Sequence, residues 1–323
     1  MKILAIGATG FVGSRVTRQL MGQGHQVALF HRGDTTTRDL HSLIHFYGTR
    51  NQLPDFKAQF EQFAPDVVLD IIPFTEAQAQ DIIPVFGGFL QRIVAISSGD
   101  VYRNYEGLQG QGNRPPDAVP LTEDAPLRET RYPYRDLEGL DFEFQQDYDK
   151  ILVEQVLMEH PDIYWTILRL PAMYGAGDRQ HRFLPYLQQM VDQQPILLEE
   201  EQARWRFSHG YVENIAAAIA LAVTDDRAAG RIYNLGEAST PTLLERIQTL
   251  GNLVNWHGEI VTLPKDQLPS HLQMNLQWQY HLAMDTTRLR EELGYVEPIP
   301  EAEALQQTIA WEQENMTTTS LEQ

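Results

Sequence analysis

Short apolar runs alternate with helical patterns along the first half of the chain. The run Ile3–Ile6 ends at a glycine-rich stretch, after which Val12, Val16 and Leu20 recur at helical spacing with polar residues between them. A second apolar run at 25–30 follows. This order predicts a strand, a glycine-rich turn, a helix and a second strand at the start of the chain.

Three later apolar runs indicate further strands of the same sheet. They cover residues 67–72, 92–98 and 166–170, and helical patterns separate them. Continuous apolar runs are typical of parallel strands that helices cover on both faces. The pattern therefore predicts an α/β fold of the Rossmann type, a doubly wound parallel sheet with its ligand crevice at the carboxyl ends of the strands.

Residues 142–160 show an amphipathic helical pattern. One stripe holds Tyr148, Ile151, Leu152, Gln155 and Val156, and the opposite stripe holds Gln146, Asp147, Lys150 and Glu154. This arrangement predicts one helix over the whole segment.

The composition indicates an acidic protein without cysteine chemistry. Of the 323 residues 42% are apolar, enough for two domains or for one α/β unit with an appendage. Lys and Arg total 25 against 44 Asp and Glu; the net charge of −19 argues against nucleic-acid and membrane-surface binding but permits a small anionic ligand. No cysteine and no metal-binding motif is present. Without a secretory signal or an apolar span of ~20 residues, we expect a cytoplasmic protein with no membrane segment.

The turn at 7–13 carries the strongest functional signal. Gly7 permits a tight turn, Gly10 lets the backbone approach a pyrophosphate, and Gly13 allows close packing of the helix on the strand. The free N–H groups of the helix N-terminus then face the anion. A purely structural turn is the alternative. The predicted cofactor-binding residues here are Gly7, Thr9, Gly10, Phe11, Val12 and Gly13.

The residues after the second strand bear on the choice of dinucleotide. An NAD enzyme usually places Asp or Glu there to hold the ribose 2′-OH, whereas this chain has His31 and Arg32, with Arg38 further along. An arginine suits a phosphate, so we expect NADP to be preferred over NAD. The alternative is that Arg32 is a solvated loop residue.

Further motifs follow the glycine loop in a fixed order. They are Ile96–Tyr102, similar to an SSxxVY strand end, then Leu121–Leu127, Leu170–Asp178, Tyr211–Ala216 and Asp285–Tyr295. Together these motifs resemble the extended short-chain dehydrogenase/reductases, the NAD(P)-dependent epimerase/dehydratase family, over nearly the whole chain. The resemblance implies a dinucleotide-binding domain at 1–170, to which segments near 205–235 and 281–288 return, and a smaller, discontinuous C-terminal substrate domain mainly at 171–316. Residues 317–323 are expected to be a disordered tail.

The family resemblance also implies catalytic roles. Ser98 would hydrogen-bond the reacting oxygen, Lys150 would hold the nicotinamide ribose and lower the pKa of a tyrosine, and Pro171 would contact the cofactor. The tyrosine belongs four residues before the lysine, but Gln146 stands there and cannot titrate.

Two other tyrosines are candidates for the missing phenol. Tyr148 precedes Lys150 by two residues, which on a helix corresponds to a rotation of about 200°. The two side chains would therefore lie on opposite faces, and a role in the core is the default for Tyr148. Tyr134, in the aromatic and basic cluster 131–135, would have to enter the site from a loop; its alternative role is to cover an insertion.

Charged residues near the later motifs form a candidate substrate site. Arg182, Arg206 and His209 would hold the diphosphate of a nucleotide-sugar, and Asp100 falls where dehydratases of the family carry a catalytic acid. The alternative is that the arginines are surface residues paired with the acidic run 199–201.

These features predict an NAD(P)-dependent oxidoreductase that acts on a nucleotide-sugar or another small hydroxyl or carbonyl substrate, as a homodimer. The alternative is a dinucleotide-binding but catalytically silent sensor or partner-binding protein. The segment Phe30–Gly33 is similar to the FNRG of the chloroplast stem-loop-binding group, which is associated with RNA. The negative charge of the chain argues against such binding.

Overall fold

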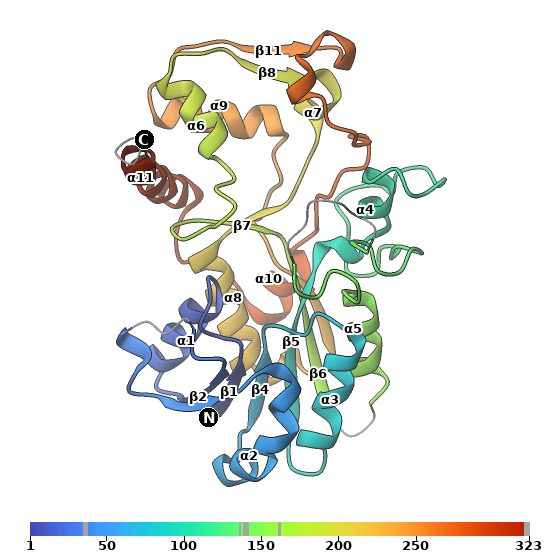
Figure 1. Cartoon of the computed structure of the whole chain (residues 1–323), viewed down its shortest axis with the longest axis vertical. Coiled ribbons are helices and arrows are strands. Elements are labelled where there is room, and N and C mark those ends of the chain that lie inside the picture. Colours follow the sequence, from blue (N-terminus) through green and yellow to red (C-terminus); the bar gives the residue numbers. More distant parts are fainter. Residues whose placement is uncertain (35–37, 136, 138–141, 161–162, 320–323) are drawn as a thin grey trace.

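A computed structural model describes residues 1–34, 38–135, 137, 142–160 and 163–319. Its centre is a seven-stranded parallel sheet of order β10-β6-β5-β4-β1-β2-β3 (Figure 1). The strands are β1 (Lys2–Ile6), β2 (Gln26–His31), β3 (Ile44–Tyr47), β4 (Val67–Asp70), β5 (Arg92–Ser98), β6 (Tyr164–Leu170) and β10 (Arg231–Asn234). The predicted α/β Rossmann fold is confirmed.

Helices cover both faces of the sheet (Figure 1). Alternate residues of β1 show why: Ile3 and Ala5 pack in one apolar cluster with α1 (Gly13–Gly22) and α8 (Val212–Thr224), whereas Leu4 and Ile6 pack in another. That second cluster takes in α2 (Lys57–Phe63), α3 (Glu76–Phe86) and α5 (Lys150–Met158). The strand order reverses between β1 and β4, and the carboxyl ends of strands at such a point form a ligand crevice.

A smaller layer lies beyond those carboxyl ends, at the top of Figure 1. Its elements are α6 (Leu184–Val191), β8 (Ile196–Glu199), α7 (Glu200–Arg204), α9 (Leu243–Leu253) and β11 (Ile260–Leu263), with β8 and β11 paired in parallel. A second parallel pair, β7 (Ala172–Tyr174) and β9 (His209–Tyr211), lies between this layer and the large sheet. The remaining helices are α4 (Arg103–Leu108), α10 (Thr287–Leu293) and α11 (Glu301–Thr319).

Helix α11 continues two residues past 317, where the disordered tail was expected to begin, and residues 320–323 lie outside the described part of the chain. No helix within the described residues combines the length and the apolar character needed to cross a membrane.

The prediction of one helix over 142–160 is wrong in its first half, because α5 begins only at Lys150. Asp149 caps the helix: its Oδ1 accepts the N–H of Ile151 at 3.0 Å. Both oxygens of this carboxylate are held by Arg128. Tyr148 forms a β-bridge with Thr75 instead of a helical turn. A contact distant in sequence therefore sets the start of the helix.

Candidate active site

The glycine loop after β1 has the close packing that the sequence predicts. Gly7 adopts a φ of +73°, which other residues rarely adopt. A Cβ atom on Gly13 would lie 2.5 Å from the Cα of Ala8, so this position needs glycine. A Cβ atom on Gly10 would meet no atom within 4 Å. Gly10 therefore leaves open space beside the N-terminus of α1.

That space belongs to a cleft of about 710 Å³. The cleft has the size of a cofactor site and lies at the carboxyl ends of β1, β2 and β4, where the strand order reverses. Six of the predicted cofactor residues line it, Gly7, Thr9, Gly10, Phe11, His31 and Arg32. Val12 is buried as the residue before α1, and the side chain of Arg38 lies outside the described part of the chain.

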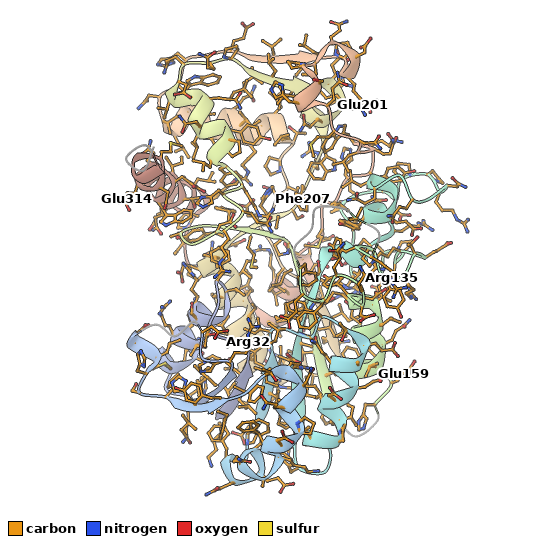
Figure 2. The ribbon with its side chains drawn as sticks, in the orientation of Figure 1. Arg32, Arg135, Glu159, Glu201, Phe207 and Glu314 are labelled. Atoms are coloured by element: carbon orange, nitrogen blue, oxygen red, sulfur yellow. The ribbon has the colours of Figure 1, made fainter. Side chains whose placement is uncertain are left out.

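One end of the cleft carries mixed charges (Figure 2, label Arg32). Arg32 has 61% of its side chain exposed and lies 3.3 Å from Asp34 and 3.5 Å from Glu143. Exposed ion pairs of this kind contribute little free energy, so the guanidinium stays available to an anion. This arrangement can accommodate a phosphate at the mouth of the cleft.

Two histidines beside Arg32 form a hydrogen-bonded chain. The N–H of Gly33 donates to His31 Nδ1, which leaves Nε2 as the protonated nitrogen; it donates to His45 Nδ1 at 2.8 Å. His45 Nε2 in turn donates to the carbonyl of Leu40 at 2.9 Å. Burial, with the neighbouring His45, lowers the pKa of His31. The His31 ring is therefore neutral in this arrangement.

Two arginines of the cleft differ in their partners. Arg15 forms three hydrogen bonds: it donates to Glu213 and, at 2.6 Å each, to the carbonyls of Phe11 and Ala176. Arg15 thereby ties the glycine loop to the loop after β7. Arg179, on that second loop, lines the cleft with an exposed side chain. It is the cation placed to face an anion opposite the glycine loop.

A buried ion pair in the cleft wall has no local sequence signal. Arg50 holds Asp70 through two hydrogen bonds of 2.7 and 2.6 Å, and both side chains are almost fully buried. Arg50 comes from the segment after β3 and Asp70 from the end of β4. Their pairing depends on the register of the sheet, which the one-dimensional pattern does not reveal.

A second cavity, of about 410 Å³, lies between the large sheet and the upper layer. The predicted residues that line it are Ser98, Asp100, Tyr134, Tyr148, Pro171 and Arg182. Pro171, expected at the cofactor, lines this second cavity and is not among the residues of the cleft wall. Arg206 and His209 are not among the residues of its wall, which Phe207 and Ser208 supply instead (Figure 2, label Phe207).

Arg206 and His209 have structural partners. Arg206 donates to the carbonyl of Thr240 at 2.5 Å. His209 donates through Nδ1 to the carbonyl of Phe207 at 2.8 Å and packs against Tyr174 and Phe183. Burial and nearby arginines lower the pKa of His209 to about 3, so its ring is neutral.

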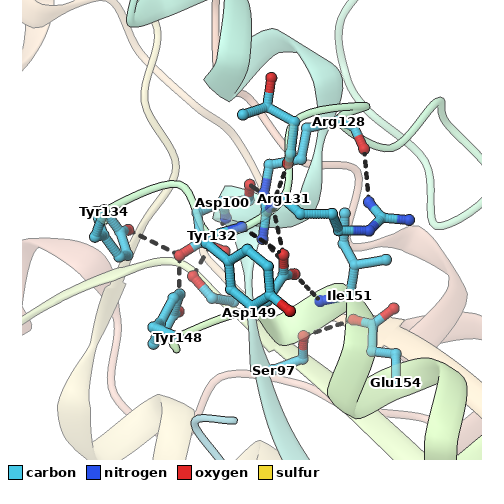
Figure 3. Close-up of polar contacts among 12 residues, drawn as sticks. Ser97, Asp100, Arg128, Arg131, Tyr132, Tyr134, Tyr148, Asp149, Ile151 and Glu154 are labelled. Carbon is cyan, nitrogen blue, oxygen red and sulfur yellow. Dashed lines mark hydrogen bonds and ion pairs between the residues drawn. The ribbon is translucent and has the colours of Figure 1, made fainter. Parts of the chain in front are cut away.

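Asp100 gathers two phenols at the base of this cavity (Figure 3). Its Oδ2 accepts hydrogen bonds from Tyr148 at 2.7 Å and from Tyr134 at 2.8 Å. Ser98, whose Oγ accepts the N–H of Asp100 at 3.2 Å, lines the same cavity. The helical-wheel argument against Tyr148 is wrong because residue 148 precedes the helix. The structure thus brings a phenol into the cavity that Ser98 lines, from a position that the usual spacing does not predict.

Gln146, at the usual tyrosine position, is exposed, and its side-chain amide donates to the carbonyl of Arg135 at 3.2 Å. Lys150 is 3% exposed and donates to the carbonyls of Pro73 and Ile96 at 2.8 Å each. Burial lowers the pKa of Lys150 to about 8. Its Nζ lies 4.8 Å from the ring centre of Phe74, a residue of the cleft wall.

Arg182 is the cation of the second cavity. Its Nε donates to the carbonyl of Met173 at 2.9 Å and lies 3.8 Å from Asp178. Gln180 and Ser208 line the same wall. The cavity can therefore bind an anionic or hydroxyl-rich group at one side and move a proton at the other. The described residues contain no group of three or more His, Asp and Glu side chains suited to a metal ion.

Comparisons with known proteins agree with this geometry. A family model described as the NAD dependent epimerase/dehydratase family matches residues 3–84 and 141–236. A chloroplast stem-loop binding protein of 41 kDa from Arabidopsis thaliana is 23% identical over 250 residues, covering 72% of this chain and 58% of that protein. The chain spans about half the length of the curated relatives it matches.

Solved structures at low identity show the fold. A UDP-glucose 4-epimerase from Thermotoga maritima, determined with UDP-glucose, is similar with a TM-score of 0.67 at 15% identity, covering 98% of this chain and 100% of that one. A short-chain dehydrogenase/reductase superfamily protein from Agrobacterium tumefaciens, with bound NAD, has a TM-score of 0.71 at 18% identity and 99% coverage of both chains.

Proposed function

Because the chain belongs to the NAD-dependent epimerase/dehydratase family, we propose that it is an NAD(P)-dependent oxidoreductase acting on a nucleotide-sugar or another small hydroxyl or carbonyl substrate. One observation carries the catalytic part: the Tyr148 phenol donates to Asp100 in the wall of the second cavity, which Ser98 also lines. A phenol beside a hydroxyl and a carboxylate can transfer a proton to or from a substrate oxygen. A catalytically silent protein has no need of this arrangement.

The cleft supports the cofactor part of the proposal. The amides at the start of α1 and the open space at Gly10 fit a pyrophosphate, and Arg179 faces it from the opposite loop. Lys150 has three donors, of which two bind carbonyls, so one is left for a ribose hydroxyl. Arg32 would bind the 2′-phosphate of NADP, which we propose as the preferred dinucleotide. When bound, the dinucleotide supplies hydride chemistry.

The second cavity supports the substrate part. Arg182 would bind an anionic group of the substrate, and Ser98 would donate to the oxygen that reacts. Two of the solved neighbours are described with UDP-glucose or with NAD. We propose the division of labour expected above, with 1–170 and the returning segments binding the dinucleotide and 171–316 mainly binding substrate. The return of β10 to the sheet supports it.

The test compares Tyr148→Phe with Tyr164→Phe, a matched loss of a phenol at an exposed position at the start of β6. UDP-sugars are first screened by thermal shift with NAD or NADP, and turnover is then measured on the sugars that stabilise the chain. We expect Tyr148→Phe to lose turnover by at least about 100-fold without loss of dinucleotide affinity, and Tyr164→Phe to keep both. Equal turnover in the two variants contradicts the role of Tyr148, whereas a wild type that binds a dinucleotide but turns over none of the sugars that stabilise it leaves the silent binder.

A further inference from the structure

Asp100 has an unusual set of partners for a buried carboxylate. Only 6% of the residue is exposed. Its Oδ2 accepts from the phenols of Tyr148 and Tyr134, while its Oδ1 is buried with no hydrogen-bond partner in the described part of the chain. A buried carboxylate oxygen without a donor is costly, and its unused lone pairs leave Asp100 able to accept a hydrogen bond or a proton.

Two cations lie near Asp100 and interact with its charge, but neither forms an ion pair with it. Arg128 donates to the backbone carbonyl of Asp100 at 3.1 Å and forms its ion pair with Asp149, in which neither side chain has exposed surface (Figure 3). Lys150 donates to two backbone carbonyls. Among the described residues, the carboxylate oxygens of Asp100 therefore have phenols as their donors, and no arginine or lysine forms an ion pair with them.

The two phenols are poor bases by themselves. Burial, and then the negative charge of Asp100, raises the pKa of Tyr148 and of Tyr134 well above the ordinary value. Tyr105, the third phenol near this carboxylate, has its pKa raised to about 12, mainly by burial. All three are protonated at neutral pH. The lysine that would favour a tyrosinate lies with its Nζ 5.9 Å from the centre of the Tyr148 ring, bound to carbonyls.

We propose that Asp100 is the proton acceptor of this site and works through Tyr148. As a substrate alcohol is oxidised, its O–H bond breaks and the proton passes to Tyr148 Oη, while the original Tyr148 proton passes to Asp100 Oδ2. The O–H electron pair forms the carbonyl double bond, and the C–H pair leaves as hydride to the oxidised nicotinamide dinucleotide of the proposed function, on which this inference rests. Reduction runs along the same path in reverse.

Tyr134 is a positioning residue in this path. Its phenol donates to the same Oδ2 at 2.8 Å and its ring packs 4.9 Å from the ring of Tyr148. It reaches the cavity from the segment between Arg128 and α5, which also supplies Tyr148. The same stretch of chain before α5 therefore brings both donors to a carboxylate that comes from the end of β5.

The deciding measurement needs no substrate. The full chain is labelled with [13Cζ]tyrosine, and the NMR signals of Tyr148 and Tyr134 are assigned from Tyr148→Phe and Tyr134→Phe. We expect both signals to move with one shared midpoint as Asp100 is protonated on acidification, and this shared step to vanish in Asp100→Asn. Tyr164 provides the internal control, and its signal should be unaffected by Asp100→Asn.

The inference is overturned if the signals of Tyr148 and Tyr134 titrate independently in the wild type. It is also overturned if they keep the shared step in Asp100→Asn. If Asp100→Asn does not fold, Tyr134→Phe decides instead. Loss of one donor to the carboxylate should move the shared midpoint, seen at Tyr148, to higher pH, and an unmoved midpoint overturns the inference.

Turnover measurements separate this inference from the proposed function. With UDP-glucose and NADP or NAD as probes, the acid limb of kcat should follow the NMR midpoint and shift with it in Tyr134→Phe, while KM stays constant. An acid limb that ignores the midpoint contradicts the proton path alone. A chain that binds neither dinucleotide contradicts the proposed function, whatever the NMR result.

Discussion

The two cavities of this protein are built in different ways. The dinucleotide cleft is organised by one continuous stretch, the turn from Gly7 to Gly13, whose glycines and helix N-terminus act together. The Asp100 cavity is assembled from segments far apart in the chain, namely the end of β5, the segment before α5, the loop after β6 and the residues before β9. A local site depends on local geometry, whereas an assembled site depends on the contacts that hold its pieces in place.

The largest expected effect comes from breaking such a contact. Arg128→Met leaves Asp149 buried without its partner, and loss of a fully buried pair costs about 3–5 kcal/mol of unfolding free energy. We expect chemical denaturation to show this loss. Arg114→Met, which removes an exposed pair with Glu129, should cost less than about 1 kcal/mol. Similar losses of unfolding free energy in the two variants would show that the Arg128–Asp149 pair does not hold the segments of the second cavity in place.

His209, on the strand beside the second cavity, should give a pH-dependent effect. Its pKa is about 3 in the folded chain, so on acidification below its ordinary value of 6.5 only the unfolded chain takes up the proton. Stability from this group is present above pH 6.5 and is lost progressively down to about pH 3. We expect a loss of about 3 kcal/mol between pH 6.5 and 4, because the slope is half of roughly 1.4 kcal/mol per unit at pH 6.5 and approaches the full value below it.

Denaturant unfolding at several pH values checks this expectation. The curve of unfolding free energy against pH should be flatter for His209→Asn than for the wild type in that range. Equal slopes would mean that His209 accepts a proton in the folded chain as readily as in the unfolded one.

Gly10→Val separates binding from stability in the cleft. The new side chain meets open space and fills the position of a phosphate, so we expect dinucleotide affinity to fall about 100-fold, or about 2.7 kcal/mol. The melting temperature should hardly change. Calorimetric titration measures the first quantity and thermal unfolding the second. Gly22→Ala, also without an atom within 4 Å of its Cβ, serves as the control at the far end of α1 and should bind normally.

Arg32→Ala should have the smallest effect. The guanidinium has 61% of its surface exposed, so its contact with a 2′-phosphate is partly screened. We expect NADP to lose about tenfold in affinity, equivalent to about 1.4 kcal/mol, and NAD to be nearly unchanged. Equal losses for both dinucleotides would reject the phosphate contact.

The contrast between the cavities also explains what the sequence could predict. The apolar runs of β1, β2, β4, β5 and β6 are long and buried, so their pattern indicated strands, and the glycine loop follows from its own spacing. β3 is only half buried and gave no such run. Arg50 and Asp70 meet only through the sheet register, so local spacing gave no sign of them.

Tyr148 shows the limit most clearly. Its neighbours fit a helical stripe, which favoured a continuous helix over 142–160. In the structure α5 begins only at Lys150, because the preceding residue, Asp149, is held by Arg128. The phenol then reaches Asp100 from a residue that follows a turn and forms a β-bridge with Thr75. Spacing rules hold only inside an element, and a contact across 21 residues decided where this element begins.

The most direct test of the account is one pair of titrations of the full chain with NADP and NAD, on Gly10→Val and Tyr148→Phe beside the wild type. The account predicts that the wild type and Tyr148→Phe bind a dinucleotide with the same affinity and that Gly10→Val loses most of this affinity. Of the two variants, only Tyr148→Phe should therefore have dinucleotide bound while lacking turnover. Absence of binding to either dinucleotide by the folded wild type would contradict it.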